Sequence, residues 1–292
     1  MLIKIGTRRS SLAIAQALEA KQKLLDFFPG LTAEIIEIKT SGDKYANANL
    51  AEIGGKGLFL KEIETELLEN NIDMAVHSLK DVPAFFSKDL AIPCVLERLS
   101  PCDTFISNKY NSLESLPQQA LIATSSIRRK VQLLNFRPDL NIVPLRGNVT
   151  TRLQNHSFDG IILAEAGLIR LKKHHLITEV LPPKIMLSAV GQGAICIQCR
   201  KNDVKIIDLL EKINNNMSFI RAKSERSFMK TVNGSCFTPL AALAEYVSEN
   251  MLHLRCMLAD EKNIYFTERT SFAEDAEKMG MDAGLELKSK CL

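Results

Sequence analysis

The sequence predicts an α/β protein with two doubly wound series of strands and helices, followed by a small α+β segment. Three observations predict this class. Short apolar segments alternate with amphipathic ones in two successive series, the pattern changes after Asn214, and residues Met251 to Thr270 hold strand-like segments of alternating character. The 292 residues are 46% hydrophobic and 24% charged, which is typical of a globular protein with two or three domains.

The first series opens with a strand, a helix and a second strand. Ser10 or Ser11 is expected to cap the helix, and Pro29-Gly30 ends it. The predicted elements are a strand at residues 2–7, a helix at 12–27 and a strand at 32–40. Repeated strand-helix units of this kind predict a parallel, doubly wound sheet.

Residues 54–83 organise the first series. A glycine-flanked Lys56 precedes a helix whose apolar side chains recur at helical spacing, and a mostly apolar strand at residues 72–77 then leads to Lys80 and Asp81. Ligands of open α/β sheets bind at this carboxyl edge. Pro83 predicts an extended or turning backbone just after Asp81, and an extended segment would point Lys80 and Asp81 to opposite sides. From this stretch alone, a solvated ion pair in a loop explains the two residues equally well.

A second series repeats this architecture, and a different pattern closes the chain. Predicted strands at residues 121–124, 140–145 and 159–164 each lead into a helix, and residues 182–199 form a crossing segment with a returning strand. The last part holds a helix at 218–230, a loop with Cys236, strands at 241–247, 251–258 and 263–270, and a final helix.

Cationic side chains stand four times where a strand gives way to a helix. The groups are Arg8-Arg9, Lys56, Arg128-Arg129, and Arg146 with Arg152. A helix start is already partly positive, so cations there are unfavourable unless an anion is bound. The pattern predicts a polyanionic ligand held by guanidinium groups. Because no phosphate loop is present, polycarboxylates or other phosphates remain open, and the few aromatic residues nearby give little support for nucleic acid.

Charge and cysteine content exclude several classes. A net charge of +3 is too small to indicate a nucleic-acid or membrane partner, and neither a signal peptide nor a membrane-spanning run is apparent, so we expect a cytoplasmic protein. Seven irregularly spaced cysteines predict free thiols and no disulfide framework. Cys196 and Cys199 are expected to be core thiols, with no metal site. Cys236 lies in a loop, where a covalent adduct or an idle thiol are both possible.

Seven segments resemble the hydroxymethylbilane synthase (porphobilinogen deaminase) family, in order and spacing from residue 2 to about residue 245. They are Gly6-Thr-Arg8-Arg-Ser10-Ser-Leu-Ala13, Gly54-Gly-Lys-Gly-Leu58, His77-Ser-Leu-Lys-Asp-Val-Pro83, Thr124-Ser-Ser-Ile-Arg-Arg129, Leu145-Arg-Gly-Asn148, Ala189-Val-Gly-Gln-Gly-Ala194 and Gly234-Ser-Cys236.

The resemblance implies three domains, the first two similar to periplasmic binding proteins. We expect them at residues 1–98 with 194–214, at 99–193 and at 215–292. It also implies a dipyrromethane cofactor attached covalently to Cys236, porphobilinogen as substrate, domain movement about residues 97–101 and 188–195, and a monomer. The reaction would join four porphobilinogen molecules head to tail, with loss of ammonia, and hydrolyse off the linear tetrapyrrole.

Residue roles follow by matching. The resemblance implies that Asp81 is the catalytic aspartate, stabilising a cationic intermediate and handling protons, with Lys80 orienting substrate or pairing with a carboxylate. Side chains matched to the binding of cofactor and substrate carboxylates are Arg8, Ser10, Lys56, Ser126, Arg128, Arg129, Arg146, Arg152 and Arg170.

Some positions depart from the family, and two other functions remain open. Glu52 stands where lysine is frequent, and Ser235 and Phe237 flank Cys236 where glycine and glutamine are common. The main alternative is an anion-binding solute or effector domain without catalysis, which would have no use for Asp81 or Cys236. An enzyme of phosphorylated substrates is a further alternative, weakened by the missing phosphate loop.

Overall fold

The computed structural model describes residues 1–40, 60–145, 147–154, 157–235 and 237–291. The chain forms two compact units, one of Met1–Leu99 with Ala194–Phe219 and one of Ser100–Gly193 with Ile220–Leu292. Among the described residues, the strands form three sheets, and the third lies in the same unit as the second. The division into three domains stays a prediction.

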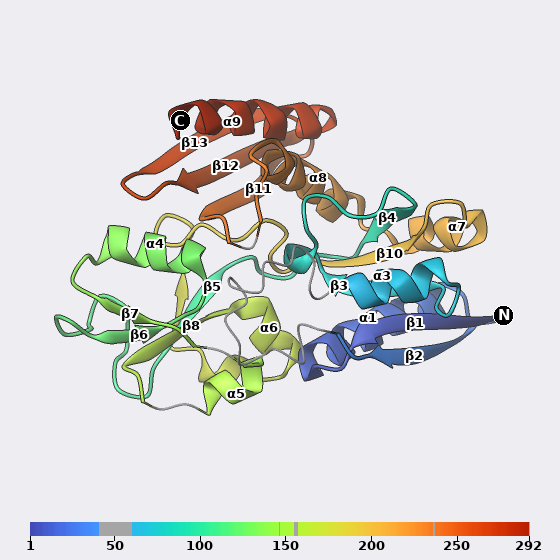
Figure 1. Ribbon diagram of the computed structural model, residues 1–292, viewed down its shortest axis with the longest axis horizontal. Coiled ribbons are helices and arrows are strands. Elements are labelled where there is room, and N and C mark those ends of the chain that lie inside the picture. The colour runs from blue at the N-terminus through green and yellow to red at the C-terminus, as the bar shows by residue number, and fades with distance from the viewer. Residues whose placement is uncertain (41–59, 146, 155–156, 236, 292) are drawn as a thin grey trace. The chain divides into compact units, whose positions relative to one another are not determined.

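The first unit is built on a sheet of strand order β2-β1-β3-β10-β4 (Figure 1). β1 is parallel to β2 and β3, whereas β10 is antiparallel to β3 and β4. A wholly parallel sheet was therefore the wrong expectation, because β10 returns from the crossing segment and runs back along β3. The elements are β1 (Leu2–Arg8), α1 (Ser11–Phe27), β2 (Thr32–Ile38), α3 (Lys61–Leu68), β3 (Met74–Ser78), the 3₁₀ turn η1 (Leu79–Asp81), β4 (Leu90–Val95), β10 (Ile195–Arg200) and α7 (Val204–Ile213).

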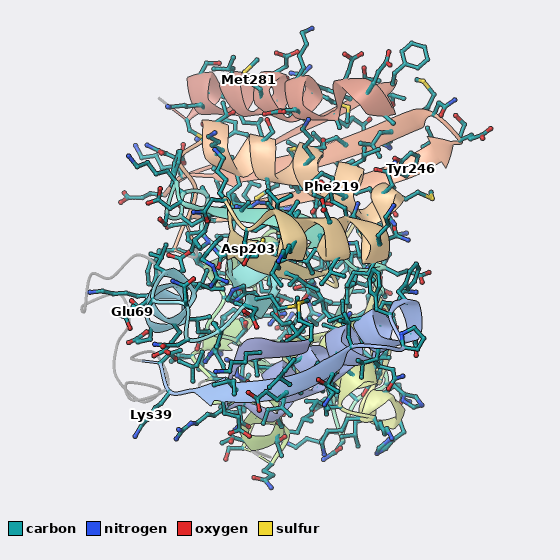
Figure 2. All side chains as sticks on the ribbon, turned by 90° about the vertical axis from the view of Figure 1, so that its right-hand side faces the viewer. Lys39, Glu69, Asp203, Phe219, Tyr246 and Met281 are labelled. Atoms are coloured by element: carbon teal, nitrogen blue, oxygen red, sulfur yellow. The ribbon has the colours of Figure 1, made fainter. Side chains whose placement is uncertain are left out.

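Helices cover both faces of this sheet, as a doubly wound fold requires. On one face, Ile5 and Val76 belong to a buried cluster with residues of α1 and α7. On the other face, Ile63 of α3 packs in a cluster with Ala75 of β3. The carboxylate of Asp203, labelled in Figure 2, caps α7 by accepting a hydrogen bond from the Ile206 N–H at 3.3 Å. The apolar faces of both helix layers thus place β3 in the interior.

The second sheet repeats the pairing pattern of the first. Its order is β7-β6-β8-β5-β9, with β6 parallel to β7 and β8, and β5 antiparallel to β8 and β9. This agreement confirms the predicted repetition of the architecture. The elements are β5 (Asp103–Ile106), β6 (Leu121–Ala123), α4 (Ile127–Phe136), β7 (Asn141–Val143), α5 (Val149–Leu153), β8 (Gly160–Ala164), α6 (Glu165–Arg170), the 3₁₀ turn η2 (His174–Leu176) and β9 (Glu179–Leu181).

The third sheet is an antiparallel meander that confirms the predicted α+β segment. α9 packs along β12 and β13 (Figure 1), and the opposite face buries Leu243 and Met257 together with Leu187 of the crossing segment. The elements are α8 (Asn216–Thr231), β11 (Leu240–Ser248), β12 (Met251–Ala259), β13 (Ile264–Phe272), the 3₁₀ turn η3 (Ala273–Asp275) and α9 (Ala276–Lys290).

Two contacts fix the helices of this last segment. Gly280 of α9 lies against the backbone of α8, because a Cβ at this position would be 2.1 Å from the Ser224 carbonyl oxygen. The buried carboxylate of Glu225 in α8 accepts hydrogen bonds from the Gly191 N–H at 2.7 Å and from the Ala244 N–H at 2.9 Å. Glu225 therefore links the crossing segment to β11.

Candidate functional site

Asp81 stands at the carboxyl end of β3, in the turn η1. The turn is anchored by Leu79 and Val82, each 1% exposed, and it is closed by a hydrogen bond from the Val82 N–H to the Leu79 carbonyl oxygen at 3.1 Å. Between these two anchors Lys80 is partly buried, and Asp81 is exposed. The backbone at Val82 is extended, as Pro83 predicted. Lys80 and Asp81 themselves are in 3₁₀ geometry, so the arrangement on opposite sides of an extended chain does not apply.

A buried polar chain lies directly before this turn. The His77 Nε2 atom is 3.1 Å from Gln198 Oε1, and Gln198 Nε2 donates to Glu64 Oε1 at 2.8 Å. Burial is the main cause that lowers the pKa of His77 to about 4, and the Arg8 charge lowers it further, against the Gln198 hydrogen bond. Burial also raises the pKa of Glu64. His77 is therefore neutral at neutral pH.

Arg8 and Ser10 follow the neighbouring strand β1. β1 pairs with β3 in parallel, with Ile5 opposite Met74 and Gly6 opposite Ala75. The Arg8 charge also lowers the pKa of the His77 imidazole in β3. The Ser10 Oγ atom accepts a hydrogen bond from the Ala13 N–H at 3.3 Å and so caps α1. Within the first unit the structure thus brings Arg8 to the same sheet edge as the strand that carries Asp81.

Arg128 and Arg129 are buried at the start of α4 and share one carboxylate. They are 4% and 6% exposed, and Asp103 at the start of β5 is 0% exposed. An Arg129 terminal nitrogen and an Arg128 terminal nitrogen each lie 2.7 Å from an oxygen of Asp103. The predicted anion at this helix start is therefore, in part, a residue of the chain itself.

Three other predicted site residues of the second unit, Ser126, Arg152 and Arg170, bind backbone groups. The Ser126 Oγ atom caps α4 by accepting from the Arg129 N–H at 3.4 Å. Arg152 Nε donates to the Gly147 carbonyl oxygen at 2.8 Å, and an Arg170 terminal nitrogen donates to that of Gly193 at 3.1 Å. Arg170 is the last residue of α6, where its charge complements the helix dipole.

Three predicted site residues, Lys56, Arg146 and Cys236, lie outside the described residues, as does Glu52. Ser235 next to Cys236 belongs to a bonded turn, since its N–H donates to Thr238 Oγ1 at 3.0 Å and its Oγ accepts from the Phe237 N–H at 3.2 Å. Phe237 is exposed.

The other cysteines are free thiols of the interior or its margin. Cys196 and Cys199 are 0% exposed, which confirms the prediction of core thiols, and burial raises the pKa of Cys199 to about 11. Burial also raises the pKa values of Cys94 and Cys256. Such thiols are poor nucleophiles at neutral pH.

Within the described ranges, no cluster of side chains suits a metal ion and no helix is long and apolar enough to span a membrane.

Asp103, Gln192 and Glu225 were not among the predicted site residues, although Gln192 lies in one of the seven matched segments. Each is 0% exposed and makes hydrogen bonds to residues distant in sequence; Gln192 and Asp103, for example, are 89 residues apart. Only the position of Asp103, a carboxylate directly before an apolar strand segment, was a usable signal.

Comparison with known proteins bears on the whole chain. The family model described as porphobilinogen deaminase, dipyromethane cofactor binding domain, matches residues 3–208, and the model of the porphobilinogen deaminase C-terminal domain matches residues 219–289. A porphobilinogen deaminase from Wolbachia sp. subsp. Drosophila simulans (strain wRi) is 90% identical over 292 residues, which is 100% of both chains. One from Ehrlichia chaffeensis is 55% identical over 98% of this chain and 97% of its own.

Among solved structures, a periplasmic substrate-binding protein of an ABC transporter from Coxiella burnetii aligns with 76% of this chain and 96% of its own, at 15% identity and a TM-score of 0.46. The family models extend past the seven motifs into the C-terminal segment, where the sequence resemblance was only architectural. Since both models match in order and relatives align from end to end, the chain belongs to the porphobilinogen deaminase family.

Proposed function

We propose that this chain is a hydroxymethylbilane synthase, a transferase that deaminates four porphobilinogen molecules and joins them head to tail into the linear tetrapyrrole hydroxymethylbilane. The observation that carries the proposal is the match of both family models, together with 90% identity over the whole chain. Membership of an enzyme family favours this function over an anion-binding domain without catalysis.

The reaction makes two chemical demands on the protein. Loss of ammonia breaks the C–N bond of the aminomethyl group and leaves a cationic azafulvene, which needs a nearby anion and a proton carrier. Each pyrrole also carries an acetate and a propionate, which need cationic partners. When bound, the dipyrromethane group supplies the pyrrole carbon to which the first unit is joined.

Asp81 is the residue that we assign to the first demand. Its carboxylate is exposed at the carboxyl end of β3, while Leu79 and Val82 hold the turn that carries it. A carboxylate in a fixed position stabilises a developing cation without moving during the reaction. It also accepts the proton that the attacked pyrrole carbon loses when the new C–C bond forms. Lys80 is assigned to orienting a substrate carboxylate.

The start of α4 fits a group that carries carboxylates. Arg128 is 4% exposed, and its buried Nε–H has no hydrogen-bond partner among the described residues. An unsatisfied buried donor of this kind is costly unless a ligand accepts from it. This donor supports a binding role for Arg128, with Arg129 and Ser126 beside it.

The same role is assigned, by matching to the family, to six further side chains. They are Arg8, Ser10, Lys56, Arg146, Arg152 and Arg170. In Ser10, Arg152 and Arg170 the described side chains also bind the protein backbone, so their assignment requires that ligand binding add to or replace these contacts.

Cys236 is assigned as the attachment point of the dipyrromethane cofactor. Its match to the family segment Gly234-Ser-Cys236 supports the assignment, whereas the six described cysteines are wholly or half buried and unsuited to hold a large adduct. We also infer that the protein works as a monomer in the cytoplasm.

The intact mass of the denatured protein tests the function. Protein purified from cells should exceed the mass of the chain by two linked pyrrole units, the excess should map to the peptide with Cys236, and porphobilinogen should increase it stepwise. Cys236→Ala should lose the excess, and the matched control Cys291→Ala should keep it. No adduct after incubation with porphobilinogen, or a fully active Cys236→Ala variant, would contradict the proposal.

A further inference from the structure

Asp103 is the meeting point of a buried network in the second unit. Its Oδ1 atom accepts hydrogen bonds from Arg129 Nε at 3.0 Å, from an Arg129 terminal nitrogen at 2.7 Å and from Gln192 Nε2 at 3.0 Å. Its Oδ2 atom lies 2.7 Å from a terminal nitrogen of Arg128. One carboxylate thus contacts both guanidinium groups.

The charges explain why a carboxylate is needed there. Arg128 and Arg129 occupy the second and third positions of α4, where the helix dipole adds to their mutual repulsion. Burial lowers the pKa of Arg128, and the Asp103 charge opposes that effect. Two buried cations without an anion would be strongly destabilising. The three side chains together keep one net positive charge, which suits one further carboxylate.

The two arginines are held differently. Arg129 makes three hydrogen bonds, two to Asp103 and one from a terminal nitrogen to the Ile162 carbonyl oxygen at 2.8 Å. Arg128 is held through its two terminal nitrogens, by Asp103 and by the Leu187 carbonyl oxygen at 2.7 Å. Its Nε–H has no partner among the described residues. The network therefore fixes the Arg128 guanidinium from two sides and leaves one donor for a ligand.

Gln192 fixes the carboxylate in turn. Its Nε2 atom donates to the Pro101 carbonyl oxygen at 2.7 Å as well as to Asp103. The side chain is 0% exposed, and it stands between Gly191 and Gly193, whose φ values of 69° and 89° suit glycine. The crossing segment therefore delivers Gln192 to Asp103 through a backbone shape that two glycines permit.

We propose that Asp103 is a positioning residue for ligand binding: it holds the guanidinium groups of Arg128 and Arg129 in the places from which they bind carboxylates of the cofactor and substrate pyrroles, and Gln192 holds Asp103. The inference rests on the proposed function, in which these arginines bind cofactor and substrate carboxylates. Asp103 itself acts through the arginines.

Steady-state kinetics of the holoenzyme tests the proposal. Asp103→Asn keeps the volume but turns an amide N–H₂ group toward guanidinium donors, so Arg128 and Arg129 should shift. Misplacement of binding groups by about 1 Å costs on the order of 100-fold, so kcat/KM should fall roughly 10- to 100-fold, mostly through KM. Asp103→Glu restores the charge and should recover part of the loss. Gln192→Met, which removes the hydrogen bonds to Asp103 and to the Pro101 carbonyl oxygen, should raise KM less than Asp103→Asn.

The matched control is Asp139→Asn, which breaks a bidentate ion pair with Arg137 in the same unit. It should leave KM within about twofold of the parent, and all variants are compared below their melting temperatures. An unchanged KM in folded Asp103→Asn and Gln192→Met would overturn the proposal, and Gln192→Met alone decides it if Asp103→Asn does not fold.

Arg128→Lys separates this proposal from the proposed function. If Arg128→Lys raises KM while Asp103→Asn and Gln192→Met do not, the positioning role fails and substrate binding by Arg128 stands. If Arg128→Lys also leaves KM unchanged, the assignment of Arg128 to substrate binding fails, and the positioning role fails with it.

Discussion

Gln198 places its amide oxygen 3.1 Å from the His77 Nε2 atom, and this contact determines where the imidazole carries its proton. Because the amide nitrogen of Gln198 donates to Glu64, the oxygen must face His77. The Nε2 atom of His77 is therefore the protonated one. A neutral histidine with one assigned tautomer thus lies just before the turn η1, separated from it only by Ser78.

We expect this histidine to make the protein less stable in acid. Unfolded His77 takes up a proton near pH 6.5, but the folded pKa is lowered to about 4, so stability falls as the pH decreases from 6.5 to about 4. The difference corresponds to about 3 kcal/mol. Urea unfolding at about pH 7.5 and about pH 4.5 should show a smaller acid loss for His77→Gln. His253→Gln, a partly exposed control, should behave as the parent. Equal acid losses in parent and His77→Gln would rule this out.

Asp81→Asn should abolish turnover and leave the fold intact. The amide cannot stabilise the azafulvene cation or accept a proton, and the loss of a general acid-base group costs about 10²- to 10⁴-fold in rate. The side chain is exposed, so the melting temperature should stay close to that of the parent. Porphobilinogen consumption is the measurement, and Asp89→Asn, an exposed aspartate of the same unit, is the control. Near-normal product formation by Asp81→Asn would refute the assignment.

Gly280→Ala should destabilise the C-terminal segment although alanine favours helices. The helix preference of alanine contributes about 1 kcal/mol. Against it, the new Cβ would stand 2.1 Å from the Ser224 carbonyl oxygen and 2.9 Å from the Phe228 backbone nitrogen, and overpacking costs about 1–3 kcal/mol or more. Gly30→Ala, where a Cβ would meet no atom within 4 Å, is the matched control. Thermal unfolding should show a lower midpoint only for Gly280→Ala; equal midpoints would mean that α8 and α9 separate readily.

Ser126→Ala distinguishes a helix cap from a ligand contact. Loss of the cap on α4 should cost about 1 kcal/mol of stability. If Ser126 also binds substrate, KM should rise in addition, whereas Ser126→Gly should cost only a few tenths of a kcal/mol and raise KM equally. Melting curves and KM values for both variants provide the test. A KM unchanged in either variant would leave Ser126 as a cap alone.

Most of the fold could be predicted because it follows local patterns. Period and capping signals place α1 within one residue of its predicted start, since Ser10 and Pro29-Gly30 mark both ends. The sheet direction could not be predicted in full. The strand β10 pairs with β3 and β4 across more than one hundred residues, and nothing in its own residues states in which direction it enters the sheet.

The candidate site, like the fold, could be predicted from the sequence only in part. Asp81 could be placed at a strand end because its neighbours carry the period of a buried strand. The surroundings of Arg128 and Arg129 could not, since their counter-ion Asp103 lies 26 residues from Arg129 and acts only through tertiary contact. An arginine pair in a sequence has the same appearance whether its anion is a ligand or another side chain.

The strand order of the first sheet has a consequence for biosynthesis. β4 pairs only with β10 within the described residues, and β10 separates it from β3. During translation, therefore, the amino-terminal sheet lacks its fourth strand until the ribosome has synthesised the whole of residues 100–193. Both units are therefore built from two separate stretches of the chain, and the first begins early but is completed late. Until β10 has been synthesised, the edges of β3 and β4 are open to pairing with other chains.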